Sequence, residues 1–113
     1  MNLDLDRRNF DGCILLFDLQ EITDAAKMEE YRSRVLATVK HYGGRYLAVG
    51  GRCEVVEGTW RPVLPVLIEF LNLEPAKAWY GSDQYKELKA LRLSATKGDA
   101  VFIESGPNEF DGP

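Results

Sequence analysis

Arg92 is the residue whose type and spacing best fit the binding of an organic anion. It lies seven residues after Tyr85 and four after Leu88, so on a helix it borders the apolar stripe rather than the solvent face. A guanidinium there can hold a carboxylate or a phenolate through two hydrogen bonds. Alternatively, Arg92 extends past the core and pairs with an internal acid such as Glu69. The spacing leaves both interpretations open.

Aromatic residues with polar tips accompany Arg92 and could line a cleft between helices and a sheet. Small organic ligands need such an apolar wall with a few polar groups. For each ring the alternative is a structural place in the core or at a subunit contact, and we favour that alternative for Tyr31 and Trp79. The full set of ligand-binding candidates is Arg92, Tyr85, Trp60, Tyr46, Tyr80, Glu69 and His41.

His41 and the two cysteines are the other reactive side chains. His41 falls in the last turn of a predicted helix, where it could carry a proton or bind haem iron. A surface residue stabilised by the helix dipole is the simpler interpretation. Cys13 and Cys53 form no CxxC pair, so we expect reduced thiols, no metal site and no bound cofactor.

Three carboxylates, Asp18, Glu69 and Glu104, are predicted to share one face of the sheet, each near the end of its strand. Such a cluster could perform acid–base or metal chemistry. The interpretation we favour is that the strand ends reach the rim of a barrel, where the acids meet water or Arg45.

The composition is that of an ordinary globular protein. The 113 residues fit one domain, and 45% of them are hydrophobic. A net charge of −4 offers no basic surface for nucleic acid or an anionic membrane, and no apolar run could cross a bilayer. Without an apolar signal segment, the chain is expected in the cytoplasm. We expect a single domain over residues 13–105, with loosely ordered ends at 1–12 and 106–113.

Hydrophobic periodicity predicts the elements that must position these side chains. Alternation with period two predicts strands over 13–19, 45–51, 63–71 and 99–105. Helical periodicity with capping residues predicts helices over 24–42, 72–80 and 83–97, the last of them ended by Gly98. Two halves of similar pattern follow each other. We therefore predict an α+β, ferredoxin-like βαββαβ fold: a four-stranded antiparallel sheet with its helices on one face.

Both faces of the predicted sheet are apolar. The helices are expected to cover Cys13, Leu15, Phe17, Leu64, Val66, Ile68, Phe70, Val101 and Ile103. The opposite face is expected to carry Ile14, Leu16, Leu47, Val49, Val63, Leu67 and Phe102. Burying those seven side chains represents on the order of 10 kcal/mol. We expect a second copy to cover them, giving a homodimer to which the arm Arg52–Arg61 adds contacts.

Four sequence blocks, GGRYLAVGG, EGTWRP, LIEF and AWYGSDQYKELKALR, resemble the DUF1330 family, a domain of unknown function. The resemblance covers roughly residues 13–105, and Cys53 departs from it. It implies a ferredoxin-like fold assembled as a dimeric α/β barrel, and no established activity. The wider superfamily that it implies includes cofactor-free monooxygenases, muconolactone-type isomerases, haem-binding enzymes and plain ligand binders.

Two classes of function remain open. The first is a site for a small organic molecule, such as an anion, in the helix–sheet cleft; its catalytic version is a cofactor-free monooxygenase or isomerase in which Tyr85 and Arg92 polarise an oxygen. The second is a non-catalytic structural or interaction dimer. A void of a few hundred Å³ that reaches Arg92 favours the first class, and aromatics packed to native density favour the second.

Overall fold

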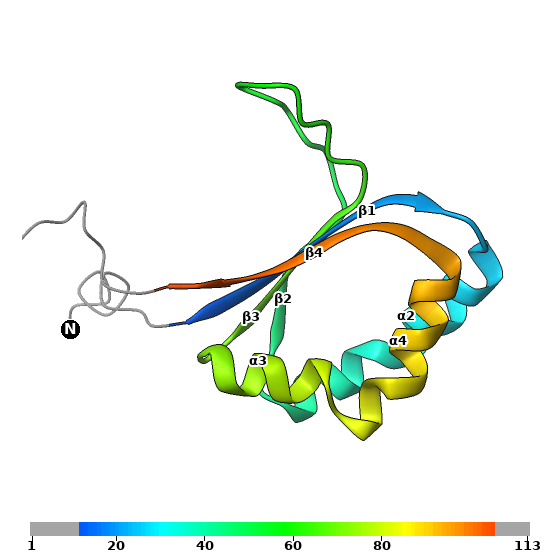
Figure 1. Ribbon diagram of the computed structural model, residues 1–113, viewed down its shortest axis with the longest axis vertical. Helices are drawn as coiled ribbons and strands as arrows, with labels where there is room; N and C mark the ends of the chain where they lie inside the picture. The colour runs from blue at the N-terminus through cyan, green and yellow to red at the C-terminus, as the bar shows by residue number, and fades with distance from the viewer. Residues whose placement is uncertain (1–11, 106–113) are drawn as a thin grey trace, which may run out of the picture.

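The fold is a four-stranded antiparallel sheet covered on one face by helices, as a computed structural model of residues 12–105 shows (Figure 1). The strands lie in the order β2-β3-β1-β4, which with the helices makes the predicted ferredoxin-like plan. The elements along the chain are β1 (Cys13–Ile22), α2 (Ala25–His41), β2 (Arg45–Val49), β3 (Pro65–Phe70), α3 (Leu73–Tyr80), α4 (Asp83–Ala95) and β4 (Thr96–Glu104). The loose ends predicted at 1–12 and 106–113 lie outside the described residues, apart from Gly12.

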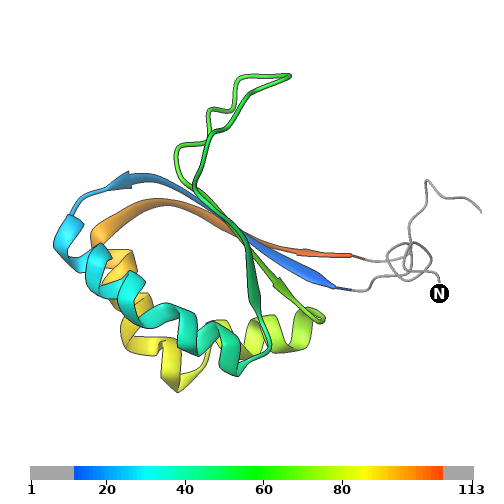
Figure 2. The ribbon, with the colours of Figure 1, turned by 180° about the vertical axis from the view of Figure 1, so that it is seen from behind.

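The core lies between the sheet and the three helices, which share one side of it in both views of the ribbon (Figures 1 and 2). The alternate residues of β1 and β3 that were predicted to face the helices are buried, as the registers Leu15↔Ile68 and Phe17↔Val66 require. Trp79 from α3 and Leu88 from α4 complete the packing beneath them. No helix within residues 12–105 has the length and apolarity to cross a membrane.

The faces of β4 are the reverse of the prediction. Phe102 is paired with Leu15, so it lies on the helix side, where its ring meets Tyr80 edge to face. Val101 and Ile103 lie on the other side and are about half exposed, at 50% and 49%. Because β4 is apolar on both of its faces, its own alternation could not settle which face is buried; the register against β1 does.

A bulge in β2 corrects a second expectation. Tyr46 is paired with Ile68, but the next pairs are Ala48↔Leu67 and Val49↔Val66, so Leu47 is an extra residue. One inserted residue reverses the side on which the following side chains lie. Val49 therefore lies on the helix side, not on the opposite face as predicted.

The helices begin where their capping residues were expected. The side chains of Asp24, Asn72 and Ser82 each accept a hydrogen bond from a first-turn amide. The end of α4 was predicted wrongly, since the helix stops at Ala95 and β4 starts at once. Gly98 lies within β4, where a Cβ would come within 2.2 Å of the Asp18 carbonyl oxygen. Glycine is needed there for close approach of two strands rather than to end a helix.

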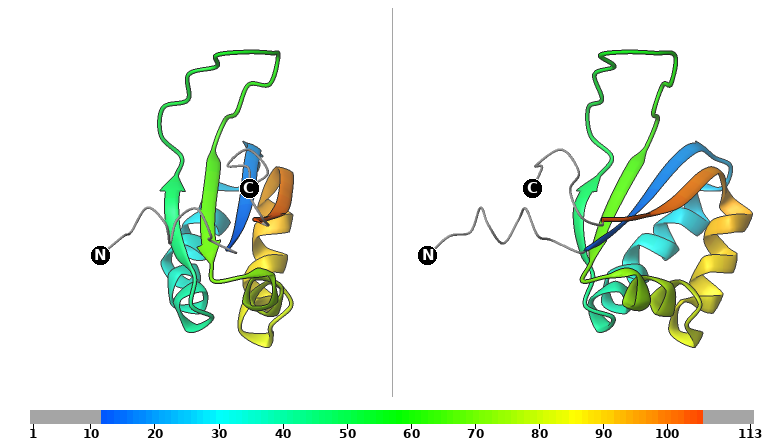
Figure 3. Two further views of the ribbon diagram at one scale, coloured as in Figure 1. Left: turned by 90° about the vertical axis from the view of Figure 1, so that its left-hand side faces the viewer. Right: turned by 60° about the vertical axis from the view of Figure 1, so that its left-hand side comes forward.

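The side of the sheet away from the helices is uncovered within the described residues and is largely apolar. We call it the open face; it carries Ile14, Leu16, Leu67, Val101 and Ile103, with Glu69 among them. The arm at residues 50–62 joins β2 to β3 and projects away from the helices (Figures 1 and 3).

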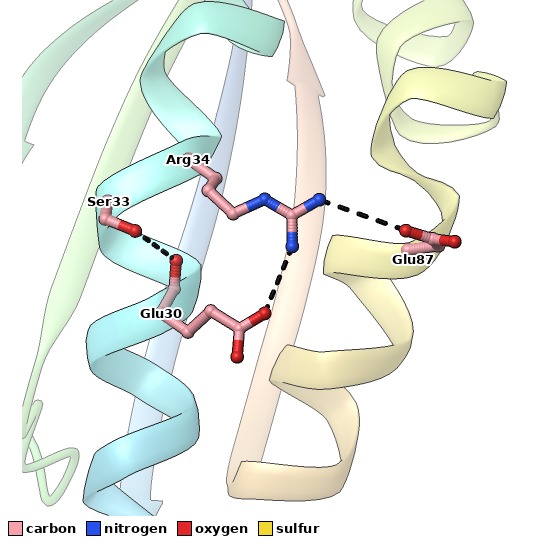
Figure 4. Close-up of polar contacts among 4 residues, drawn as sticks. All are labelled: Glu30, Ser33, Arg34 and Glu87. Carbon is pink, nitrogen blue, oxygen red and sulfur yellow. Dashed lines mark hydrogen bonds and ion pairs between the residues drawn. The ribbon is translucent and has the colours of Figure 1, made fainter.

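Surface ion pairs join α2 to α4 on their outer side. Arg34 lies between the helices, 3.1 Å from Glu30 of its own helix and 3.9 Å from Glu87 of α4 (Figure 4). These groups are about half exposed or more, so each pair stabilises the fold by roughly 0–1 kcal/mol at most. The helices are held together mainly by what lies beneath this surface.

Candidate functional site

A cavity of about 470 Å³ lies between α2, the end of α4 and the helix side of the sheet. Its wall is mostly aliphatic and aromatic, and four polar side chains reach it: Tyr31 and Arg32 from α2, Tyr46 from β2 and Arg92 from α4. The exposed lining residues Leu36 and Val49 mark its mouth, which opens beside the edge strand β2. An apolar enclosure with a few convergent polar groups is the usual form of a small-molecule site.

Arg92 is the one buried charge in this wall. Its side chain is only 5% exposed, and its guanidinium carbon lies 4.8 Å from the centre of the Phe17 ring. Its Nε donates a hydrogen bond of 3.2 Å to the Tyr85 hydroxyl. Its Nη2 is buried without a hydrogen-bond partner among the residues 12–105. A buried cation without an acid is costly for a folded protein, so Arg92 is better suited to an incoming anion than to stability.

The acid considered as a partner for Arg92 lies elsewhere. Glu69 is on the open face, where it accepts a hydrogen bond of 2.6 Å from Arg45. The sheet separates it from Arg92, because the helix side of β3 is occupied by Ile68 and Phe70. The internal ion pair between Arg92 and Glu69 is therefore not formed.

Three phenols, those of Tyr31, Tyr85 and Tyr46, lie in or behind the wall of the cavity. The hydroxyls of Tyr31 and Tyr85 are 2.7 Å apart, and Tyr85 also accepts from Arg92. Burial raises the pKa of Tyr31 and of Tyr85 above the ordinary value, and it raises the pKa of Tyr46 to about 12. All three phenols are therefore neutral near pH 7 and can act as hydrogen-bond donors.

Of the predicted candidates, Arg92 and Tyr46 line the cavity, and Tyr85 is bonded to Arg92 behind its wall. The other four lie elsewhere. Trp60 is on the arm, where its indole N–H donates to Asp18 over 2.8 Å. Tyr80 lies under the Lys89 ammonium, against Phe102. Glu69 is on the open face, and His41 is exposed at the end of α2 beside Tyr42.

The three carboxylates do not form a cluster. Asp18 is aligned with Pro65, whereas Glu69 and Glu104 lie at the level of Ile14 and Cys13, at the other end of β1. Four residues along a strand separate Pro65 from Glu69, about 13 Å. β1 runs antiparallel to both neighbours, so Asp18 lies at the opposite end of the sheet from the other two acids. Glu104 is paired with the buried Cys13, so it lies on the helix side of the sheet and not, as predicted, on the face that carries Glu69. Within the described residues no group of three or more His, Cys, Asp or Glu side chains could hold a metal ion.

Two residues, Tyr31 and Asp18, make contacts that their sequence positions did not predict. Tyr31 lies on the apolar stripe of α2, which favoured a purely structural role; its contact with Tyr85 spans 54 positions and left no local signal. Asp18 has a role that its strand position did not reveal. It is buried, and it accepts hydrogen bonds from Trp60, from the amide of Val63 and from Gln20, so it fixes the base of the arm.

The model of one protein family, described as a domain of unknown function (DUF1330), matches residues 14–105. The chain belongs to the DUF1330 family. This family match covers every residue that lines the cavity, Arg92 included. A search of curated proteins gives no match to the chain.

Solved structures share the fold at low sequence identity. A protein of unknown function from Rhodopseudomonas palustris has a TM-score of 0.68 at 12% identity, covering 91% of this chain and 90% of that one. SnoaB, a cofactor-independent oxygenase from Streptomyces nogalater, has a TM-score of 0.58 at 9% identity, covering 88% and 97%. A dimeric protein of unknown function with a ferredoxin-like fold, from Bacteroides fragilis, has a TM-score of 0.51 at 16% identity, covering 83% and 94%. At these identities the likeness establishes the fold alone.

Proposed function

We propose that this DUF1330 protein binds a small organic anion in the cavity beneath its sheet, with Arg92 as the counter-charge. The observation that carries the proposal is the guanidinium of Arg92, whose Nη2 is buried and unpartnered within the described residues. An anion in the cavity would supply the missing acceptor and neutralise the charge.

The cavity itself argues against a purely structural role for the aromatic residues. Protein interiors are packed about as densely as organic crystals, with few voids larger than a water molecule. A space of about 470 Å³ bordered by Tyr31, Tyr46 and Arg92 departs from that density.

Native mass spectrometry of freshly purified protein tests the proposal. We expect the wild type to carry a small organic acid, or to acquire one from a panel of benzoate, phthalate and 4-nitrophenol. Arg92→Met should lose this binding, because it keeps the aliphatic stem and removes the charge. Arg34→Met is the matched control, since Arg34 is about half exposed on the outer side of α2, does not line the cavity and pairs with Glu30 at 3.1 Å. Wild-type protein that carries none of these compounds, and takes up none of them, would refute the proposal.

A second candidate function is cofactor-independent oxidation or isomerisation of the bound compound. It is supported by the fold shared with SnoaB, which is described as such an oxygenase. The lining of the cavity contains phenols and arginines but no histidine and no carboxylate. A substrate would therefore have to ionise readily without a protein base. Oxygen uptake measured with and without the co-purifying compound tests this candidate.

We further propose that two copies associate through the open face. The support is the apolar character of that face, together with the description of the Bacteroides fragilis protein as dimeric. The arm carries the exposed side chains Val56 and Trp60, which would add contacts to the second copy.

A further inference from the structure

We infer that the cavity is selective for weak organic acids that carry one ionisable group on a compact apolar body, and that it binds them as the conjugate base. The inference rests on the proposed function and specifies its ligand. It follows from the number of charges, the direction of the hydrogen bonds and the size of the space.

The count of charges limits the ligand to one negative group. Arg92 is the one buried charge in the lining, and Arg32 is half exposed at the mouth, where it already pairs with Glu29. A second anionic group inside the cavity would be surrounded by residues such as Phe17 and Val66, without a partner. An uncompensated charge in apolar surroundings is strongly disfavoured. A dianion therefore fits this site poorly.

The hydrogen bonds around Tyr85 decide which phenol donates its O–H to the other. The Tyr85 oxygen accepts from Arg92 Nε at 3.2 Å, and it lies 2.7 Å from the Tyr31 oxygen. Tyr85 is fully buried and does not line the cavity, so its O–H is satisfied when it donates to Tyr31. The O–H of Tyr31, which does line the cavity, is then free to donate to the ligand. Together with the guanidinium of Arg92, which also lines the cavity, this gives the ligand two donor residues from different helices.

The site has donors for an anion but no group to receive a proton. Among the described residues the lining has no carboxylate, histidine or cysteine, and its phenols are already protonated. An acid that enters must therefore release its proton to water at the mouth while its oxygen keeps the electron pair. The cavity then favours ionisation by stabilising the product, because the buried guanidinium interacts with the anion and not with the neutral acid.

The volume sets the size of the apolar body. At roughly 30 Å³ for each water-sized group, about 470 Å³ holds about 15 such groups. Much of the wall is formed by aliphatic side chains, including Val49 and Leu64, which offer no hydrogen bonds to a ligand. A one- or two-ring phenol or carboxylic acid fits this description, and a sugar or a nucleotide does not.

The ionisation of a coloured phenol inside the cavity tests the inference. 4-Nitrophenol absorbs visible light as its phenolate, and 4-nitroanisole is its neutral analogue of nearly the same shape. With wild-type protein we expect the bound phenol to ionise at a pH at least one unit below that of the free phenol. This corresponds to a preference of at least tenfold for the phenolate over the phenol. The anisole should bind at least tenfold more weakly than the phenolate.

Two variants assign the effect to the proposed donors. Arg92→Met should abolish the shift, whereas Arg34→Met, on the outer side of α2, should leave it within about twofold of the wild type. Tyr31→Phe keeps the guanidinium and removes one hydroxyl, so it should weaken phenolate binding by about tenfold. Because Tyr31→Phe removes a single hydroxyl and keeps the ring, it tests the inference even if Arg92→Met does not fold.

The remaining outcomes separate the ligand class from the proposed function. If 4-nitrophenol and 4-nitroanisole bind equally while benzoate still depends on Arg92, selection of the ionised form of weak acids is wrong and anion binding stands. If phthalate binds more tightly than benzoate, and does so through Arg92, the limit to one charge is wrong. If no anion of the panel binds, both the ligand class and the proposed function fail.

Discussion

At the scale of single residues, the conflict between stability and binding is concentrated in Arg92. Its Nε has a partner and its charge lies over the Phe17 ring, but its Nη2 is buried with none among the described residues. Helical spacing placed Arg92 beside the apolar stripe correctly. The sequence could not reveal whether an acid lies next to Arg92. Glu69 is 23 positions away, and only the register of its strand decides on which side of the sheet its side chain lies.

Replacement of Arg92 by methionine should change stability little. The variant loses one hydrogen bond and one cation–π contact, and it also removes a buried unpartnered N–H group and a desolvated charge. These opposing effects are each about 1–3 kcal/mol. We expect the free energy of unfolding in urea, without ligand, to stay within about 1 kcal/mol of the wild type. Leu88→Ala, which truncates a buried residue of the same helix, should cost about 2–5 kcal/mol. A loss of 3 kcal/mol or more for Arg92→Met would show that the guanidinium is structural.

At the scale of elements, the arm depends on an acid in a neighbouring strand. Asp18 accepts hydrogen bonds from Trp60 Nε1 at 2.8 Å and from the Val63 amide at 3.2 Å. Burial by itself raises the pKa of the Asp18 carboxyl. The hydrogen bonds that it accepts lower this pKa by more than burial raises it, so the net shift is downward. The contribution of Asp18 to stability is therefore complete above about pH 4, the ordinary value for an aspartate, and it disappears as the pH falls through the lowered pKa.

Acidification should therefore release the arm, and Asp18→Asn should release it at every pH. In Asp18→Asn an NH₂ group, which is itself a donor, replaces one of the two oxygens that accept hydrogen bonds from Trp60 and from the Val63 amide. At most part of these hydrogen bonds can therefore re-form. The fluorescence of Trp60, recorded from pH 7 to pH 3, reports this change. We expect a wild-type transition below pH 4 that is absent in Asp18→Asn. Trp60→Phe removes the signal of the arm and leaves that of the buried Trp79 as the control. If Asp18→Asn kept the wild-type transition, another group would hold the arm.

At the scale of the whole molecule, sequence predicted the architecture well and the two sides of the sheet less well. Capping residues, periodicity and the order of elements were enough for the ferredoxin-like plan. The predictions of which residues of β4 and of the end of β2 face the helices were wrong. Alternation fixes which residues share a face but not which face is buried. A bulge at Leu47 and the pairing of Leu15 with Phe102 are decided between strands, where a single sequence carries little information.

The open face gives a prediction for the assembly. Leu67 lies within this face, beside Leu16 on the neighbouring strand. Leu67→Asp should raise the dissociation constant of a dimer by more than about 100-fold, because a charge would enter a desolvated interface at a cost of several kcal/mol. Leu93→Asp, at an exposed position of α4, should leave association unchanged. Light scattering at micromolar concentration measures both. A wild-type monomer in that experiment would overturn the proposed association.

The place of the cavity beside β2 has a consequence for kinetics. β2 is hydrogen-bonded to β3 alone in the described sheet, and an edge strand with one neighbour opens locally at a lower free energy than a central strand. A ligand of the proposed kind, held by Arg92, would leave through the mouth beside Val49, and fraying of a few residues of β2 would widen that mouth without unfolding the domain. Its residence time would follow the stability of this edge and would be largely independent of the global stability of the fold.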